Sequence, residues 1–71
     1  MNRDITQQNL YILLPGKINS LAKLIVQNQG KSFFDAINMI YNSKTYKLLE
    51  TESSKYWTYG PVALYESLMS E

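Results

Sequence analysis

The apolar positions of the chain begin with a stretch at residues 9–14, in which only the first residue is polar. Leu10, Ile12 and Leu14 recur at every second position, which is the period of a β-strand. An unbroken apolar run also fits a buried strand or a short helix. Pro15 follows directly, and a proline disfavours helical geometry in the residue before it. We therefore predict a strand over this stretch.

A helix is predicted between Pro15 and Gln29, where apolar side chains recur at spacings of three and four. Proline suits the start of a helix, because the first helical position needs no backbone N–H donor. Gly30 tolerates the left-handed backbone with which many helices end. These two residues therefore mark the ends of the helix. Its shared apolar face contains Ile18, Leu21, Ala22 and Ile25.

A second helix is predicted from Ser32 to about Asn42. Ser32 can cap its first turn, and Asp35 stands three residues later, as in a loose capping box. Phe33 and Phe34 open the apolar pattern of this helix. The periodicity assigns the pair to the core rather than to a platform that stacks on single-stranded nucleic acid.

The last third of the chain predicts one or two short helices. Ser43 either caps a helix through Leu49 or lies in a polar patch of the preceding helix. A loop follows by composition at residues 51–54, and the Gly60-Pro61 pair opens a last helix. The predicted fold is therefore mainly α-helical, with one N-terminal strand.

Composition excludes most catalytic chemistry. The 71 residues contain neither cysteine nor histidine, which rules out disulfides, thiolate or imidazole metal sites, and Ser-His-Asp or Cys-His catalysis within one chain. No carboxylates are arranged as a credible acid–base pair. We predict no catalytic site, cofactor or metal, and hence no enzyme.

Composition also bounds size and location. The chain forms one small domain whose core is marginal on its own, so we predict a homodimer. No apolar run approaches the roughly 20 residues that span a membrane, and we predict no membrane contact. The absence of cysteine is compatible with the cytoplasm, where we place the protein.

Charge is distributed unevenly along the chain. Residues 1–47 carry six basic and two acidic side chains, whereas residues 48–71 carry one basic and four acidic side chains. This arrangement fits a body that faces a polyanion and a separate end that faces a partner. Plain solvation of the surface is the alternative.

The order of these elements resembles the ribbon-helix-helix family of bacterial and phage repressors and antitoxins. The resemblance covers about residues 8–43 and rests on the Leu-Pro pair at 14–15 and the Gly-Lys-Ser turn at 30–32. It implies a strand and two helices that pair with a second chain, strand against strand. The matching apolar positions are Leu10, Ile12, Leu14, Ile18, Ala22, Ile25, Val26, Ile37 and Tyr41.

The resemblance divides the domain into three parts. A flexible arm is expected at residues 1–8, and the ribbon-helix-helix-like body at residues 9–43. Residues 44–71 form an aromatic and acidic helical extension that the family pattern does not cover.

In that family the paired strands enter the major groove of double-stranded DNA, and their outward side chains contact base edges. The resemblance places Asn9 and Tyr11 at these groove-reading positions. Leu13 occupies a third outward position and offers base edges no hydrogen bond. The resemblance therefore implies DNA recognition that is weakened or altered.

The family also holds DNA phosphates at the start of its second helix, where free backbone N–H groups favour an anion. Lys31 and Ser32 occupy those positions here. Lys17 can add attraction that does not depend on base sequence. An ordinary helix cap is the alternative role for Ser32, and the two roles are compatible.

Tyr56, Trp57 and Tyr59 form an aromatic group in the extension. Trp and Tyr anchor many protein interfaces, so these residues are a candidate partner-binding surface. Large amphipathic rings also pack the small cores of short domains, and Trp57 in particular fits that role. Both roles stay open at this point.

These observations predict a small dimeric regulatory protein, either a DNA-binding repressor or an antitoxin-like partner. The alternative is a helical protein–protein interaction module that binds no DNA. Leu13 on the reading face and a net charge of only +1 support the alternative. A helix in place of the strand at residues 9–14 would favour it outright.

Overall fold

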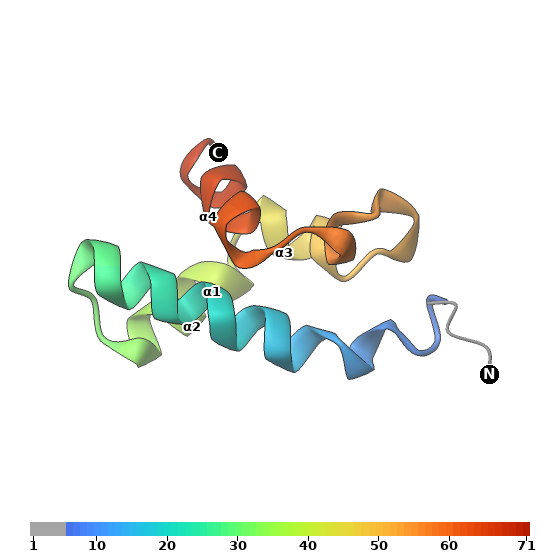
Figure 1. The fold of residues 1–71 in the computed structure, drawn as a ribbon, viewed down its shortest axis with the longest axis horizontal. Helices are drawn as coiled ribbons and strands as arrows, with labels where there is room; N and C mark the ends of the chain where they lie inside the picture. Colours follow the sequence, from blue (N-terminus) through green and yellow to red (C-terminus); the bar gives the residue numbers. More distant parts are fainter. Residues whose placement is uncertain (1–5) are drawn as a thin grey trace.

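The computed structural model describes residues 6–71, which form helices joined by short loops (Figure 1). The described residues contain no β-strand. In chain order the elements, with η for 3₁₀ helices, are η1 (Leu10–Ile12), α1 (Leu14–Gln29), α2 (Phe33–Tyr41), α3 (Lys44–Leu49), η2 (Glu52–Ser54), η3 (Tyr56–Thr58) and α4 (Pro61–Met69).

Both predicted ends of the first helix are confirmed to within one residue. Helix α1 begins at Leu14, and Pro15 lies in its first turn, where a missing N–H breaks no helical hydrogen bond. Gly30 ends the helix in the left-handed conformation, with φ 68°. Its N–H donates to the carbonyl of Val26 at 3.0 Å, which satisfies one of the last free carbonyls of the helix.

Serine caps begin the next two helices. The hydroxyl of Ser32 accepts the N–H of Asp35 at 3.1 Å, which confirms the predicted cap of α2. The hydroxyl of Ser43 accepts the N–H of Tyr46 at 3.0 Å, so α3 is a separate third helix rather than a continuation of α2. The predicted start of α4 at Pro61 is also confirmed.

The N-terminal strand predicted at residues 9–14 is wrong, and the ribbon of a ribbon-helix-helix fold is absent from residues 6–71. Leu10 is only 1% exposed whereas Ile12 is 65% exposed, so burial does not follow the alternating pattern. A strand needs a partner strand to satisfy its backbone groups. Here the turn η1 satisfies them locally, and the N–H of Leu13 donates to the carbonyl of Leu10 at 2.9 Å.

The expected effect of Pro15 on the residue before it is also wrong. Leu13 has helical backbone angles, φ −82° and ψ −27°, and Leu14 already belongs to α1. The preference against helix before a proline is a steric bias. In this chain the turn at η1 feeds directly into the helix and overrides that bias.

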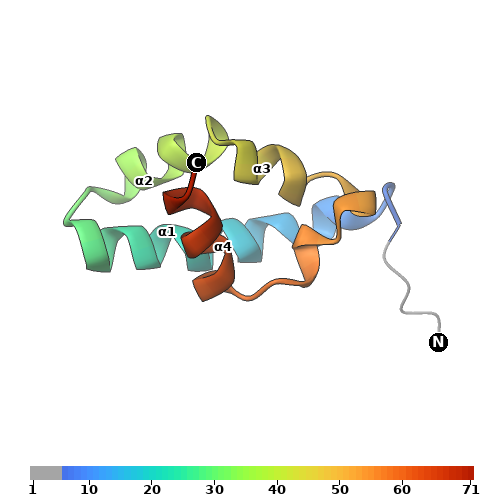
Figure 2. The same ribbon diagram turned by 90° about the horizontal axis from the view of Figure 1, so that it is seen from above.

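Helix α1 is the central element of the fold. It contacts both α2 and α4, and Figure 2 shows α2 and α3 following one another along one side of it. The buried side chains of the core are small or aliphatic, and no Phe, Tyr or Trp belongs to them. The core cluster consists of Ile18, Leu21, Ala22, Ile25, Ala36, Ile40, Leu49, Leu64 and Leu68.

The end of α4 is fixed to the start of α3 by Glu71. Its carboxylate accepts the backbone N–H of Lys44 at 3.0 Å, the N–H of Thr45 at 2.7 Å and the hydroxyl of Thr45 at 2.6 Å. Burial raises the pKa of Glu71, but these hydrogen bonds and the Lys44 charge outweigh it and hold the pKa below its ordinary value. The carboxylate therefore acts as a second cap on α3.

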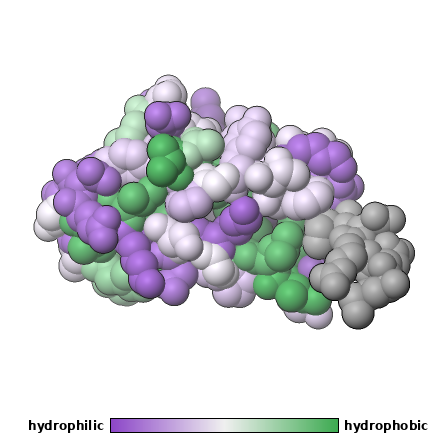
Figure 3. Space-filling view, viewed as in Figure 1, coloured by the Kyte–Doolittle hydropathy of each residue, from purple (hydrophilic) through white to green (hydrophobic). Residues whose placement is uncertain are grey.

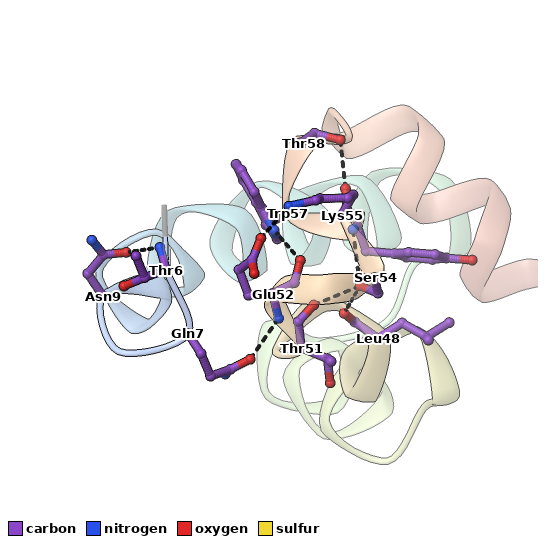
Figure 4. A network of polar contacts seen from close by, with 11 residues as sticks. Thr6, Gln7, Asn9, Leu48, Thr51, Glu52, Ser54, Lys55, Trp57 and Thr58 are labelled. Atoms are coloured by element: carbon purple, nitrogen blue, oxygen red, sulfur yellow. Dashed lines mark hydrogen bonds and ion pairs between the residues drawn. The ribbon is translucent and has the colours of Figure 1, made fainter. Parts of the chain in front are cut away.

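A polar network joins the N-terminal turn to the loop after α3 (Figure 4). The side-chain amide of Gln7 donates to the carbonyl of Glu50 at 3.0 Å and accepts the N–H of Glu52 at 2.8 Å. The indole N–H of Trp57 donates to the carbonyl of Glu52 at 2.9 Å. Residues 6–8 of the predicted arm are therefore tied to the body through Gln7, whereas residues 1–5 lie outside the described part.

Candidate functional site

The predicted phosphate-binding residues do not form one site. Ser32 caps α2, and Lys31 is exposed in the turn before it. Lys17 lies near the opposite end of α1, about 20 Å away along the helix axis. Its ammonium donates to the carbonyl of Tyr59 at 2.7 Å, and it lines a hollow of about 340 Å³ between α1 and α4. Lys31 and Ser32 therefore stay together at the start of α2, whereas Lys17 lies apart from them.

The residues predicted to read the DNA major groove, Asn9 and Tyr11, do not lie on a β-strand. Asn9 precedes η1, and its side-chain oxygen accepts the N–H of Thr6 at 2.8 Å. Tyr11 lies within η1 and lines a different kind of surface, described below. Neither side chain projects from a ribbon, because η1 takes its place.

Tyr56, Trp57 and Tyr59, here called the C-terminal aromatic cluster, lie beside the core. Tyr56 and Trp57 are partly buried and pack against the core side chains. Tyr59 is more exposed, and its ring centroid lies 4.9 Å from that of Tyr56. The packing role is therefore observed for two of the three residues, and partner binding by this cluster stays a prediction.

An open groove of about 440 Å³ lies between α1 and α2, here called the aromatic groove. Its floor and walls come from η1, both helices and the start of α3. The lining residues are Tyr11, Leu14, Pro15, Ile18, Asn19, Phe33, Ile37, Tyr41 and Tyr46.

The placement of Phe33 and Phe34 in the core is wrong. Phe33 lines the aromatic groove and is 46% exposed, and Phe34 beside it is 73% exposed. Ala36 and Ile40 are the residues of α2 that reach the core. Phe34 lies 120–160° around the helix from these two residues and so faces away from the core, whereas Phe33, in the first turn, lines the groove.

The exposed aromatic surface continues along the groove. Tyr11 is 68% exposed and Tyr41 is 49% exposed. The ring of Tyr41 meets that of Tyr46 edge to face, with centroids 4.9 Å apart. On the face shown in Figure 3, hydrophobic residues also gather over η1 and the first turn of α1, whereas the C-terminal half of α1 is hydrophilic. A helical surface with this many uncovered rings is typical of a site of association.

The chemistry of the aromatic groove is that of a contact surface. Its lining includes no charged side chain, and the amide of Asn19 and three tyrosine hydroxyls are its polar side-chain groups. Burial raises the pKa of the Tyr46 phenol, and the neighbouring Glu50 carboxylate and Tyr41 raise it further. The tyrosine is therefore a neutral hydrogen-bonding group rather than a nucleophile.

Two further properties concern ligands of other kinds. Within residues 6–71, no group of three or more acidic side chains is placed to hold a metal ion. In the same part of the chain, no helix combines the length and the apolar character needed to cross a bilayer.

One signal in the sequence could have located the aromatic groove. Helix α2 places Phe33, Ile37 and Tyr41 at successive spacings of four, which forms a second apolar stripe beside the one that contains Ala36 and Ile40. Within this second stripe Ile37 packs against the core, whereas Phe33 and Tyr41 stay about half exposed.

Comparison of this chain with protein-family models, with curated proteins and with solved structures finds no match. The aromatic groove is therefore interpreted from its own geometry and chemistry.

Proposed function

We propose that this protein is a cytoplasmic helical protein–protein interaction module without catalytic activity, and that it works by self-association through the aromatic groove. The observation that carries the proposal is the row of exposed rings along an uncharged groove. These rings lie outside an entirely aliphatic core. Exposed aromatic rings on a helical face gain most when a complementary apolar surface covers them.

The size of the exposed surface supports a second copy of the chain as the occupant. Phe and Tyr bury about 150–250 Å² each when fully covered, so the exposed parts of Tyr11, Phe33, Phe34 and Tyr41 offer on the order of 500 Å². A standard interface buries about 800 Å² per partner, a little over half of it apolar. The groove face therefore supplies the apolar share of one dimer interface.

The elongated shape of the molecule supports the same proposal. The body measures 41 by 22 by 18 Å, so a large share of its apolar groups lies near the surface. A domain of this length without disulfides has a small core and gains stability when a second copy covers such groups. Dimerisation would supply that cover.

Regulation through DNA binding stays an untested prediction, but two structural features on which it depended are changed. The strand that would have carried Asn9 and Tyr11 into the major groove is replaced by η1. The basic residues Lys17 and Lys31 lie toward opposite ends of α1. The interaction module is the function that these positions favour.

Sedimentation velocity tests the proposal over a series of concentrations from low micromolar to millimolar. We expect the parent chain to dimerise, and Phe33→Ser and Phe34→Ser each to raise the dissociation constant at least tenfold, as loss of a central aromatic contact does. The matched control is Val62→Ser, which removes an exposed apolar side chain from α4, outside the groove. Circular dichroism verifies that each variant keeps its helices.

Two outcomes would overturn the proposal. One is a parent chain that stays monomeric at every concentration. The other is a dimer that both phenylalanine variants leave intact, since the interface would then lie elsewhere. A monomeric chain that binds duplex DNA with an affinity that falls steeply with salt would instead support the DNA-binding regulator.

A further inference from the structure

The two ends of the aromatic groove carry opposite charges. At one end the groove is closed by Tyr46, and Glu50 lies one helical turn further on, near enough to raise the pKa of the Tyr46 phenol. At the other end Lys23 lies one helical turn beyond Asn19, on the same side of α1. Both charged side chains are exposed. The uncharged groove therefore has an acidic residue at one end and a basic residue at the other.

The other charged residue of α2 does not disturb this arrangement. Asp35 stands two positions from both Phe33 and Ile37, which places it about 200° around the helix from the groove-lining side. Around α3, Glu50 lies about 40° from the groove-lining Tyr46, whereas Lys47 and Lys44 lie about 100° and 160° from it and so away from the groove.

At the other end, the exposed Lys31 lies in the turn between α1 and α2 and adds a second positive charge to that of Lys23. Lys23 and Glu50 are thus the charged residues on the groove side of α1 and α3.

The face of the molecule that contains the aromatic groove also carries an exposed ring, that of Phe34, which can fill such a groove. Phe34 stands on the α2 rim of the groove, 73% exposed, next to the groove-lining Phe33. A surface that carries both a projecting ring and a hollow is self-complementary, because each copy can insert its ring into the other. Such a surface forms an isologous contact about a two-fold axis.

We propose that two copies of the chain pair with their aromatic grooves antiparallel about a two-fold axis. In this arrangement Lys23 of each copy lies opposite Glu50 of the other, and Phe34 enters the partner's groove. This inference rests on the proposed self-association and specifies its direction. A parallel pairing would set like charges opposite one another at both ends, which is unfavourable for exposed charges at low salt.

Charge reversal tests the direction of pairing. We expect Lys23→Glu and Glu50→Lys each to weaken the dimer about tenfold at low salt, because the two-fold axis doubles the effect of each substitution. The variant with both substitutions restores the opposite charges in reversed order. It should therefore dimerise within about twofold of the parent, and added salt should reduce all of these differences.

Disulfide trapping gives a second readout, because the chain contains no cysteine of its own. Lys23→Cys mixed with Glu50→Cys should form a cross-linked heterodimer on mild oxidation, whereas Lys23→Cys alone should not cross-link to itself. The matched control is Ser20→Cys, an exposed position on the side of α1 that faces α4. Its mixture with Glu50→Cys should stay uncross-linked.

The outcomes separate this inference from the proposed function. If the parent dimerises but the double charge reversal is as weak as the single variants, or Lys23→Cys cross-links to itself, the antiparallel pairing is overturned and self-association stands. If the parent does not dimerise at all, the proposed function fails first.

Discussion

The aromatic side chains of this protein occupy two regions with opposite properties. In the C-terminal aromatic cluster, Tyr56 and Trp57 lie against the core. In the aromatic groove, Phe33 and Tyr41 are about half exposed. Both regions are built from the same kinds of side chain at the edge of the same aliphatic core. The difference therefore comes from what surrounds the rings.

Polar contacts distinguish the two regions. The C-terminal aromatic cluster is held by the indole N–H of Trp57 on the carbonyl of Glu52, and Gln7 holds the same loop from the N-terminal side. Glu71 fixes the following helix, α4, to α3. The aromatic groove has no such contact across its opening among the described residues. Hydrogen bonds thus close one region and leave the rings of the other exposed to solvent.

The largest effect on stability is expected from Trp57→Ala. This change removes a partly buried ring and its hydrogen bond to Glu52, and we expect it to lower the free energy of unfolding by about 2–3 kcal/mol. Urea denaturation followed by circular dichroism measures the loss. Trp57→Phe keeps a ring but not the N–H, and should cost about 1 kcal/mol. A loss below 0.5 kcal/mol for Trp57→Ala would show that the cluster does not support the fold.

An intermediate effect is expected from Glu71→Gln, which weakens the second cap of α3. We expect a loss of about 1 kcal/mol at neutral pH, typical of a helix cap. Because the pKa of Glu71 is lower in the folded chain, its stabilisation is complete above the ordinary pKa near 4.5 and is lost as pH falls through the folded value.

Thermal melts between neutral pH and pH 3 test this dependence. The difference in stability between the parent and Glu71→Gln should shrink as the pH falls. The matched control is Glu66→Gln, an exposed carboxylate on α4. A difference that stays constant with pH would show that the Glu71 charge is not what fixes α4 to α3.

The smallest effect is expected from Phe34→Ser on the isolated monomer. Because most of its ring is in solvent, we expect the free energy of unfolding to change by no more than about 0.5 kcal/mol at concentrations where the chain is monomeric. Urea melts at high dilution measure this change. A loss above about 1.5 kcal/mol would mean that Phe34 packs within its own chain, and the contrast between the two aromatic regions would disappear.

Helix ends were predictable because the signals that set them are local. The left-handed glycine at Gly30, the serine cap at Ser32 and the proline at Pro61 act within one turn of their own positions. None of them depends on how the helices later pack. These boundaries follow from the residue types alone.

The strand at residues 9–14 and the sorting of the aromatic rings were not predictable in this way. Five apolar residues in a row fit either period, and the choice depended on whether a partner strand was present. Phe33 was expected in the core, yet the smaller Ala36 and Ile40 pack there against α1. The packing of the neighbouring helices decides which of the two apolar stripes of α2 faces the core. The sequence of α2 alone does not distinguish them.

The position of Trp57 makes its intrinsic fluorescence a probe of one region of the protein. It is the single tryptophan of the chain, and it lies in the C-terminal aromatic cluster rather than in the aromatic groove. Its indole is hydrogen-bonded to Glu52, and the Lys55 ammonium lies 5.5 Å from its ring centroid. Tryptophan emission therefore reports on the closed region alone. Tyrosine emission is not selective in this way, because Tyr11, Tyr41 and Tyr46 line the groove whereas Tyr56 and Tyr59 belong to the cluster.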